Sequence, residues 1–130
     1  MMPGPGPRPD GFAPGRHLID AYGAGGFRFA EMSHKGSILM LPSGVRAWTA
    51  IDAQPWLASQ FLDVFAEAEA IELLLLGTGV NLRPLPEALR WRFKELKIGV
   101  ELMTTPPAAR TYNILVAEGR KVAAALIAVD

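Results

Sequence analysis

The second half of the chain alternates between continuous apolar runs and segments of helical periodicity, and this alternation constrains the fold more than any other feature. Residues Ile71–Leu76 (IELLLL) form a nearly continuous apolar run, which is typical of a strand buried on both faces. A helical pattern over 86–97, a short strand over 100–103, a helix from Thr105 to the stop at Gly119 and a last strand over 121–129 follow. This order predicts an α/β protein with a mixed sheet and helices on both faces.

The first third of the chain is rich in short β-type segments that are separated by Gly and Pro turns. We expect strands over 17–22, 27–31, 37–41 and 45–51, and because they follow one another closely we expect hairpins. Between 55 and 68 the apolar side chains recur at helical spacing, and Pro55 suits a first helical turn. We therefore predict a helix there.

The length favours a single domain. The chain has 130 residues, close to the commonest domain size. Nine of its first fifteen residues are Gly or Pro, so we expect residues 1–15 to be a disordered tail and residues 16–130 to form the domain. No run is apolar enough for a membrane span and no targeting segment is recognisable, so we expect a cytoplasmic protein.

Composition and motif content argue against several classes of function. The chain has no cysteine, which removes disulfide, thiolate-metal and cysteine-nucleophile chemistry. Its 13 basic and 13 acidic side chains balance, which argues against nucleic acid as a partner. His17 and His34 do not lie at metal-ligand spacing, and no catalytic motif is present. We therefore expect no catalytic residue, no metal and no cofactor.

A glycine-rich turn directly follows the apolar run Ile71–Leu76. Gly77, Thr78 and Gly79 lie where the carboxyl ends of strands in open α/β sheets favour ligands. A dinucleotide-binding turn would have a third glycine at position 82, which is Leu82 here. The turn is thus either a plain tight turn or the rim of another kind of cleft.

A dense polar patch lies near the end of the next strand. Helix-start amides, hydroxyls, an amide and a guanidinium could together bind an anion or a main-chain segment. The alternative is structural, with the threonines capping the helix and Asn113 bonding to neighbouring backbone. The patch consists of Thr104, Thr105, Arg110, Thr111, Tyr112 and Asn113.

The predicted helix over 86–97 carries a second candidate surface. Trp91 lies about 200° around the helix from Leu89, so it faces away from the apolar stripe. Trp and Arg are the usual anchors of protein interfaces, which makes Arg90, Trp91 and Lys94 interface candidates. Packing of Trp91 against the sheet or a loop is the alternative.

The stretch Gly99–Ile127, with the block TPPAARTYNILVAEGR from Thr105 to Arg120, resembles a family of small uncharacterised α/β domains. The family includes mitochondrial complex I assembly factor 3, and the resemblance runs from about Leu18 to Val129. It implies a three-layer α/β fold with a central mixed sheet and an extra β-hairpin layer. It also implies a non-enzymatic role, because the eukaryotic member helps to assemble a membrane-bound respiratory complex by binding other factors.

Two hypotheses about function follow. The first is a protein-binding module that acts through the Arg/Trp helix or the polar patch, with the assembly of a membrane complex as its role. The second is a site for a small anionic ligand, with or without weak enzymatic activity, at the strand ends between Gly77–Gly79 and Thr105–Asn113. The sequence specifies neither the partner, the ligand nor the oligomeric state.

Overall fold

The centre of the molecule is a six-stranded mixed sheet. The computed structural model describes residues 12–130, and the strand order within them is β1-β6-β5-β9-β7-β8. Strand β7 is parallel to both β8 and β9, whereas the pairs β5–β9, β5–β6 and β1–β6 are antiparallel. In sheet order, the strands span Phe12–Pro14, Gly44–Ala47, Ile38–Met40, Val122–Leu126, Leu73–Gly77 and Gly99–Met103.

The two innermost parallel strands combine large and small side chains. Strand β7 (LLLLG) lies beside β9 (VAAAL), and every residue of β9 is buried. Successive side chains of a strand point to opposite faces, so Ala123 and Ala125 pack in one core and Ala124 in the other. The small side chains of β9 leave room for the layers above and below the sheet.

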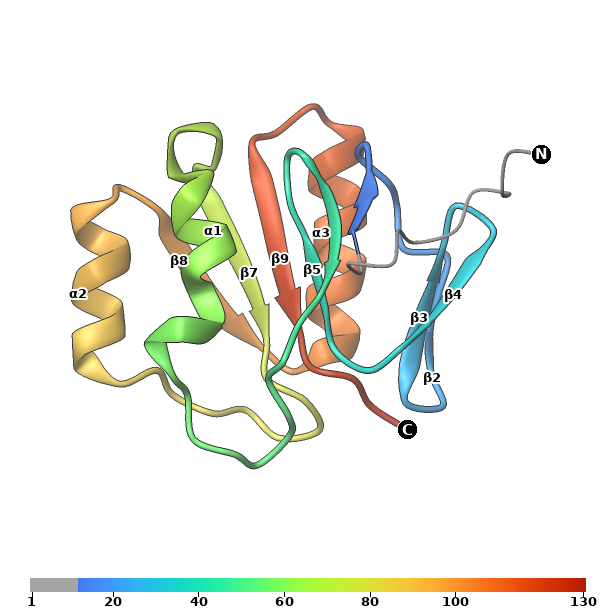
Figure 1. The fold of residues 1–130 in the computed structure, drawn as a ribbon, viewed down its shortest axis with the longest axis horizontal. Helices are drawn as coiled ribbons and strands as arrows, with labels where there is room; N and C mark the ends of the chain where they lie inside the picture. Colours follow the sequence, from blue (N-terminus) through green and yellow to red (C-terminus); the bar gives the residue numbers. More distant parts are fainter. Residues whose placement is uncertain (1–11) are drawn as a thin grey trace.

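Helices α1 (Leu62–Ala66) and α2 (Glu87–Glu95) pack in the core on one face of the sheet, and α3 (Thr105–Ala117) packs in the core on the other. Beside α3 lies a three-stranded antiparallel sheet, whose strands span Ala21–Gly23 (β2), Gly26–Phe29 (β3) and Met32–Lys35 (β4). Figure 1 shows this small sheet and α2 at opposite ends of the molecule. The α/β class, the mixed sheet and the extra β layer are confirmed.

The connections of the parallel strands place three strand ends on the same side of the main sheet, at its carboxyl-terminal end. The chain passes from β7 through α2 to β8, and from β8 through α3 to β9. Because β7, β8 and β9 are parallel, their carboxyl ends meet, and the loop after β7 lies beside the start of α3. Within residues 12–130, no helix is both long enough and apolar enough to cross a bilayer.

The first third of the chain differs from the prediction in several places. Residues 12–14, expected in the disordered tail, form β1 and pair with β6, while residues 1–11 lie outside the described part. The strand predicted over 17–22 begins only at Ala21, and the one over 45–51 starts at Gly44 and ends at Ala47. The segment predicted as one strand over 27–31 turns back at Ala30–Glu31 into β4, which was not predicted.

The helix predicted over 55–68 is shorter and broken. The α-helical part is α1 alone, with a 3₁₀ segment before it (Ala58–Phe61) and another after it (Ala68–Ala70). Of the apolar side chains at helical spacing in this segment, Phe61 and Val64 are fully buried, but Leu57 is exposed. Trp48 and Trp56 explain the irregular path of this segment. Both indoles enter the same core as Phe61 and donate hydrogen bonds to backbone carbonyls.

Candidate functional site

The strand ends contain a closed hydrogen-bond network rather than an open cradle. The Thr105 hydroxyl accepts a hydrogen bond from the Gly79 N–H (3.1 Å) and donates one to the Ile127 carbonyl (2.7 Å). The Thr105 N–H donates to the Gly79 carbonyl (3.0 Å), and the Ile127 N–H donates to the Gly77 carbonyl (2.9 Å). Thr105 therefore joins the ends of β7 and β9 to the first turn of α3.

Both glycines of the turn lie against neighbouring atoms. A Cβ at Gly77 would lie 2.8 Å from Leu126 Cδ2 and 3.0 Å from Thr105 Oγ1. Gly79 has a φ of +100°, and a Cβ there would collide with the Asp52 carboxylate. Since the space above each glycine is occupied by protein, the backbone is not exposed there to a ligand.

Thr78 is also used within the fold. It is fully buried, its N–H donates to the Met103 carbonyl (2.8 Å) and its hydroxyl donates to the Asn81 carbonyl (2.7 Å). Thr104 is the residue that precedes α3, and its side chain makes no capping hydrogen bond. The two threonines therefore serve the structure, as in the structural alternative, but not by capping, because the Thr105 hydroxyl bonds across the strand ends instead.

The remaining polar residues of α3 point to different surroundings. The Asn113 amide accepts from the Ile19 N–H (2.8 Å) and donates to the Ile19 carbonyl (2.7 Å). Arg110 is exposed and donates to the Tyr22 hydroxyl (3.0 Å). The Thr111 hydroxyl lies 3.8 Å from the Met103 sulfur. Arg110 and Asn113 thus hold parts of the small-sheet layer against α3, which supports the structural alternative for this patch.

Tyr112 lies inside the core, although it has a polar hydroxyl. Its side chain is fully buried among the residues that α3 packs against β9 and the small sheet. Burial raises the pKa of Tyr112 above its ordinary value, and the Arg16 guanidinium partly opposes this by charge and hydrogen bonding. The phenol stays neutral in the ordinary pH range and is not accessible to a ligand.

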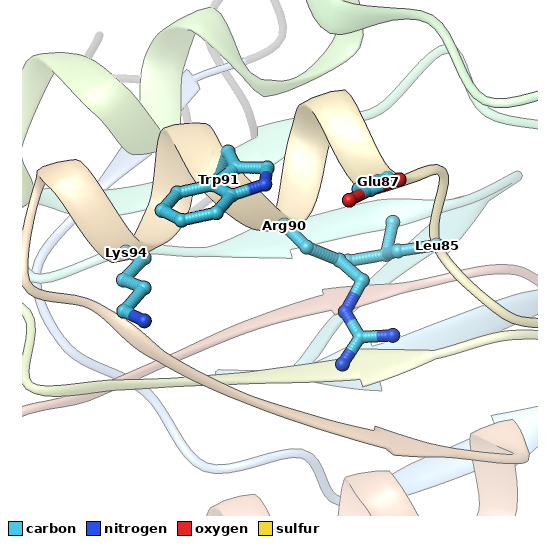
Figure 2. A pocket seen from close by; sticks show the side chains of 5 residues that line it. All are labelled: Leu85, Glu87, Arg90, Trp91 and Lys94. Atoms are coloured by element: carbon cyan, nitrogen blue, oxygen red, sulfur yellow. The ribbon is translucent and has the colours of Figure 1, made fainter.

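The candidate interface residues of α2 lie together around one hollow. Arg90, Trp91 and Lys94 line a depression of about 500 Å³ with Leu85 and Glu87. Figure 2 shows these five side chains. Trp91 is 56% exposed, so the alternative in which it packs into the sheet is wrong. The Lys94 ammonium lies 5.0 Å from the centroid of the Trp91 ring, within the range of a cation–π contact.

The opposite side of α2 fixes the helix to the core. Leu89 and Phe93 are buried, and the Phe93 ring makes edge contacts with Phe61 (5.4 Å) and Phe65 (5.2 Å). Residues 89 and 93 are four apart and so share one face, while Trp91 points elsewhere. The helix therefore presents an indole and two cations on a rigid support.

A second hollow extends from this surface toward strand β8. It has a volume of about 300 Å³, and Leu85, Arg90 and Lys94 line it as well as the first hollow. On the strand side it is lined by Val100 and Leu102, which are half-buried and were not among the predicted site residues. The strand itself was predicted, but its position at the sheet edge has no local signature.

Among residues 12–130, no group of three His, Asp or Glu side chains gathers closely enough to hold a metal ion. The polar groups of the strand ends are bonded to protein. On α2, by contrast, exposed functional groups line a shared hollow. The arrangement is suited to contact with another macromolecule.

Comparison with known proteins identifies related sequences. A family model described as "Protein of unknown function (DUF498/DUF598)" matches residues 19–127. An uncharacterised protein of Rhodobacter capsulatus is 40% identical over 121 residues, which cover 93% of this chain and 91% of that protein. The NADH dehydrogenase (ubiquinone) 1 alpha subcomplex assembly factor 3 of Homo sapiens is 31% identical over 109 residues, 84% of this chain and 59% of the assembly factor. The chain thus spans about three fifths of that relative's length.

Solved structures of related proteins share the fold. A Bartonella henselae protein, described as an outer membrane protein, has a TM-score of 0.86 and 49% identity, over 90% of this chain and 98% of that one. A Rhodopseudomonas palustris protein has a TM-score of 0.76 and 42% identity, over 88% and 87% of the two chains. These similarities confirm the architecture derived above.

Proposed function

The chain belongs to the family of proteins of unknown function DUF498/DUF598, and we propose that it is a protein-binding module that acts in the assembly of a membrane-bound complex of the respiratory type. The family's curated relatives include assembly factors of NADH dehydrogenase, which suggests protein partners for this chain. We also propose that it works in the cytoplasm, which fractionation of its own cells would check.

One observation carries the proposal. Arg90, Trp91 and Lys94 surround a shared hollow on a helix whose other face is anchored in the core. An exposed indole leaves apolar surface in water, and Trp and Arg are the side chains that most often anchor protein interfaces. The polar patch at the strand ends supports the proposal less, because its hydroxyls and amide are already bonded.

The test is affinity purification of the tagged protein from its own cells in mild detergent, followed by mass spectrometry. We expect a reproducible set of subunits or assembly factors of a respiratory-type complex. The variant Trp91→Ala with Arg90→Ala should lose this set while its melting temperature stays near that of the wild type, since both side chains are exposed.

A matched control separates the α2 surface from exposure in general. Ile114 is 58% exposed on α3, which packs on the opposite face of the sheet, so Ile114→Ala should retain the partners. Unchanged partner capture by the stable Trp91→Ala, Arg90→Ala variant would refute the α2 surface. Recovery of the bait alone from wild-type cells would argue against the binding role as a whole.

A further inference from the structure

Strand β8 ends the main sheet on one side, and within the described part of the chain no strand lies along its outer edge. Among residues 12–130, β8 pairs with β7 and with no other strand. The Gly99 N–H donates to the Glu72 carbonyl, and the Met103 carbonyl accepts from the Thr78 N–H. Since the backbone groups of successive residues point to alternate sides of a strand, those of Val100 and Leu102 point away from β7, toward the open edge.

This edge has few of the usual protections against pairing. Natural edge strands are commonly blunted by proline, lysine, a bulge or extreme shortness. Strand β8 has five residues in regular register with β7, without proline or lysine, although Glu101 is exposed on it. An exposed edge of this kind is a template for an added strand.

The hollow between α2 and β8 indicates the chemistry of such a strand. Its lining combines apolar side chains with two cations and no carboxylate. Arg90 and Lys94 both belong to this lining, and Figure 2 shows both side chains extending from the same side of α2. On the other face of β8 the exposed charge is the Glu101 carboxylate. An added strand therefore meets cations and apolar groups on its α2 side and an anion on its other side.

We propose that an extended acidic segment of a protein partner adds to β8 as a seventh strand of the main sheet, with alternate apolar and acidic side chains in the hollow lined by Arg90, Lys94, Val100 and Leu102. This inference rests on the proposed function, since it specifies how the partner binds beside the Trp91 surface. Backbone hydrogen bonds to Val100 and Leu102 supply affinity, and the two cations select for carboxylates.

The direct test is a titration of the full, isotope-labelled chain with the synthetic peptide Val-Thr-Glu-Thr-Val-Thr-Glu, followed by NMR. The peptide has Val and Glu on one face and Thr on the other. We expect saturable shifts at the amides of Val100 and Leu102, with slowed hydrogen exchange at both. The same peptide with Lys in place of Glu should bind about tenfold more weakly or not at all. No shift at these amides, or equal binding of the Lys peptide, would overturn the proposal.

Two variants separate the backbone contribution from the charge contribution. Leu102→Pro removes an N–H that points away from β7, so the internal ladder loses no donor. Arg90→Glu with Lys94→Glu reverses two exposed charges and leaves the backbone edge intact. Each should weaken peptide binding by about tenfold or more. If Leu102→Pro does not fold, the charge-reversal variant and a peptide methylated on its backbone nitrogens still decide the question.

The natural partner distinguishes failure of this inference from failure of the proposed function. A partner that is lost from the Trp91→Ala, Arg90→Ala variant but retained by Leu102→Pro would overturn strand addition and leave the α2 surface as the binding site. A second copy of this chain is another possible occupant of the edge. Dimerisation that Leu102→Pro abolishes, without peptide binding to the wild type, would assign the edge to self-association and refute the acidic segment.

Discussion

Gly79 shows how a single residue can be required by its neighbours as well as by its own backbone. Its φ is +100°, and a Cβ would collide with the Asp52 carboxylate. Gly119 also has a positive φ, +76°, but has nothing within 4 Å of the same position. The two sites therefore differ in steric environment, although both follow from the same rule about left-handed backbone.

We expect Gly119→Ala to lower the free energy of unfolding by about 1–2 kcal/mol, the cost of a left-handed residue with a Cβ. Gly79→Ala should cost more, since the collision with Asp52 adds to the strain. Urea unfolding measures both. In an Asp52→Ala background, the additional loss of unfolding free energy caused by Gly79→Ala should shrink. An equal loss for both glycine variants in the wild-type background would contradict a collision with Asp52.

At the scale of elements, Thr105 links two strands and a helix. Its buried hydroxyl satisfies the Gly79 N–H and the Ile127 carbonyl at the ends of β7 and β9. Thr105→Val keeps the shape but leaves both backbone groups without this partner, so we expect a loss of about 1–3 kcal/mol in unfolding free energy.

The neighbouring threonine is the matched control. Thr104 is half-buried and makes no capping hydrogen bond, so Thr104→Val should change stability by less than about 0.5 kcal/mol. Chemical denaturation compares the two. A Thr105→Val variant as stable as the wild type would show that this hydroxyl is not structural and would revive the hypothesis of a ligand site at the strand ends.

At the scale of the whole molecule, Asn113 on α3 holds the segment that leads into the three-stranded sheet. Its amide bonds both backbone groups of Ile19, which packs in the core with Phe27 and Phe29 of β3. We expect Asn113→Ala to speed hydrogen exchange of the amides in β2–β4 more than of those in β7, because local opening of this layer becomes easier. Ile114→Ala is the exposed control and should leave both sets unchanged. Equal acceleration in both sheets would contradict a separate anchoring role.

The elements of the second half were predictable because their signals are local. The apolar run before Gly77, the helix that presents Trp91 and the proline-containing first turn of α3 each follow from periodicity and end signals. The exposure of Trp91 on α2 could also be predicted, because residue spacing sets the angular position of a side chain on a helix. The place of α2 next to an open strand edge could not be predicted in this way.

The first third resisted prediction because its structure depends on partners distant in sequence. In the turn between β3 and β4, Ala30 and Glu31 have positive φ, a conformation that Asn and Gly adopt most readily. Because neither residue is typical of such a turn, the sequence did not predict the hairpin or strand β4. Strand β1 exists through pairing with β6, about thirty residues away. The strand predicted over 45–51 ends at Ala47, because the next residue, Trp48, packs in the core with α1 and α2.

By itself, the sequence determined the α/β class, the helices of the second half and the outward direction of Trp91, since each depends on residues within a few turns of one another. Only the tertiary structure decided that the polar patch is bonded internally and that β8 lies at the edge of the sheet. The reason is physical: the use of a hydroxyl, an amide or a strand edge depends on which distant groups the fold brings beside it.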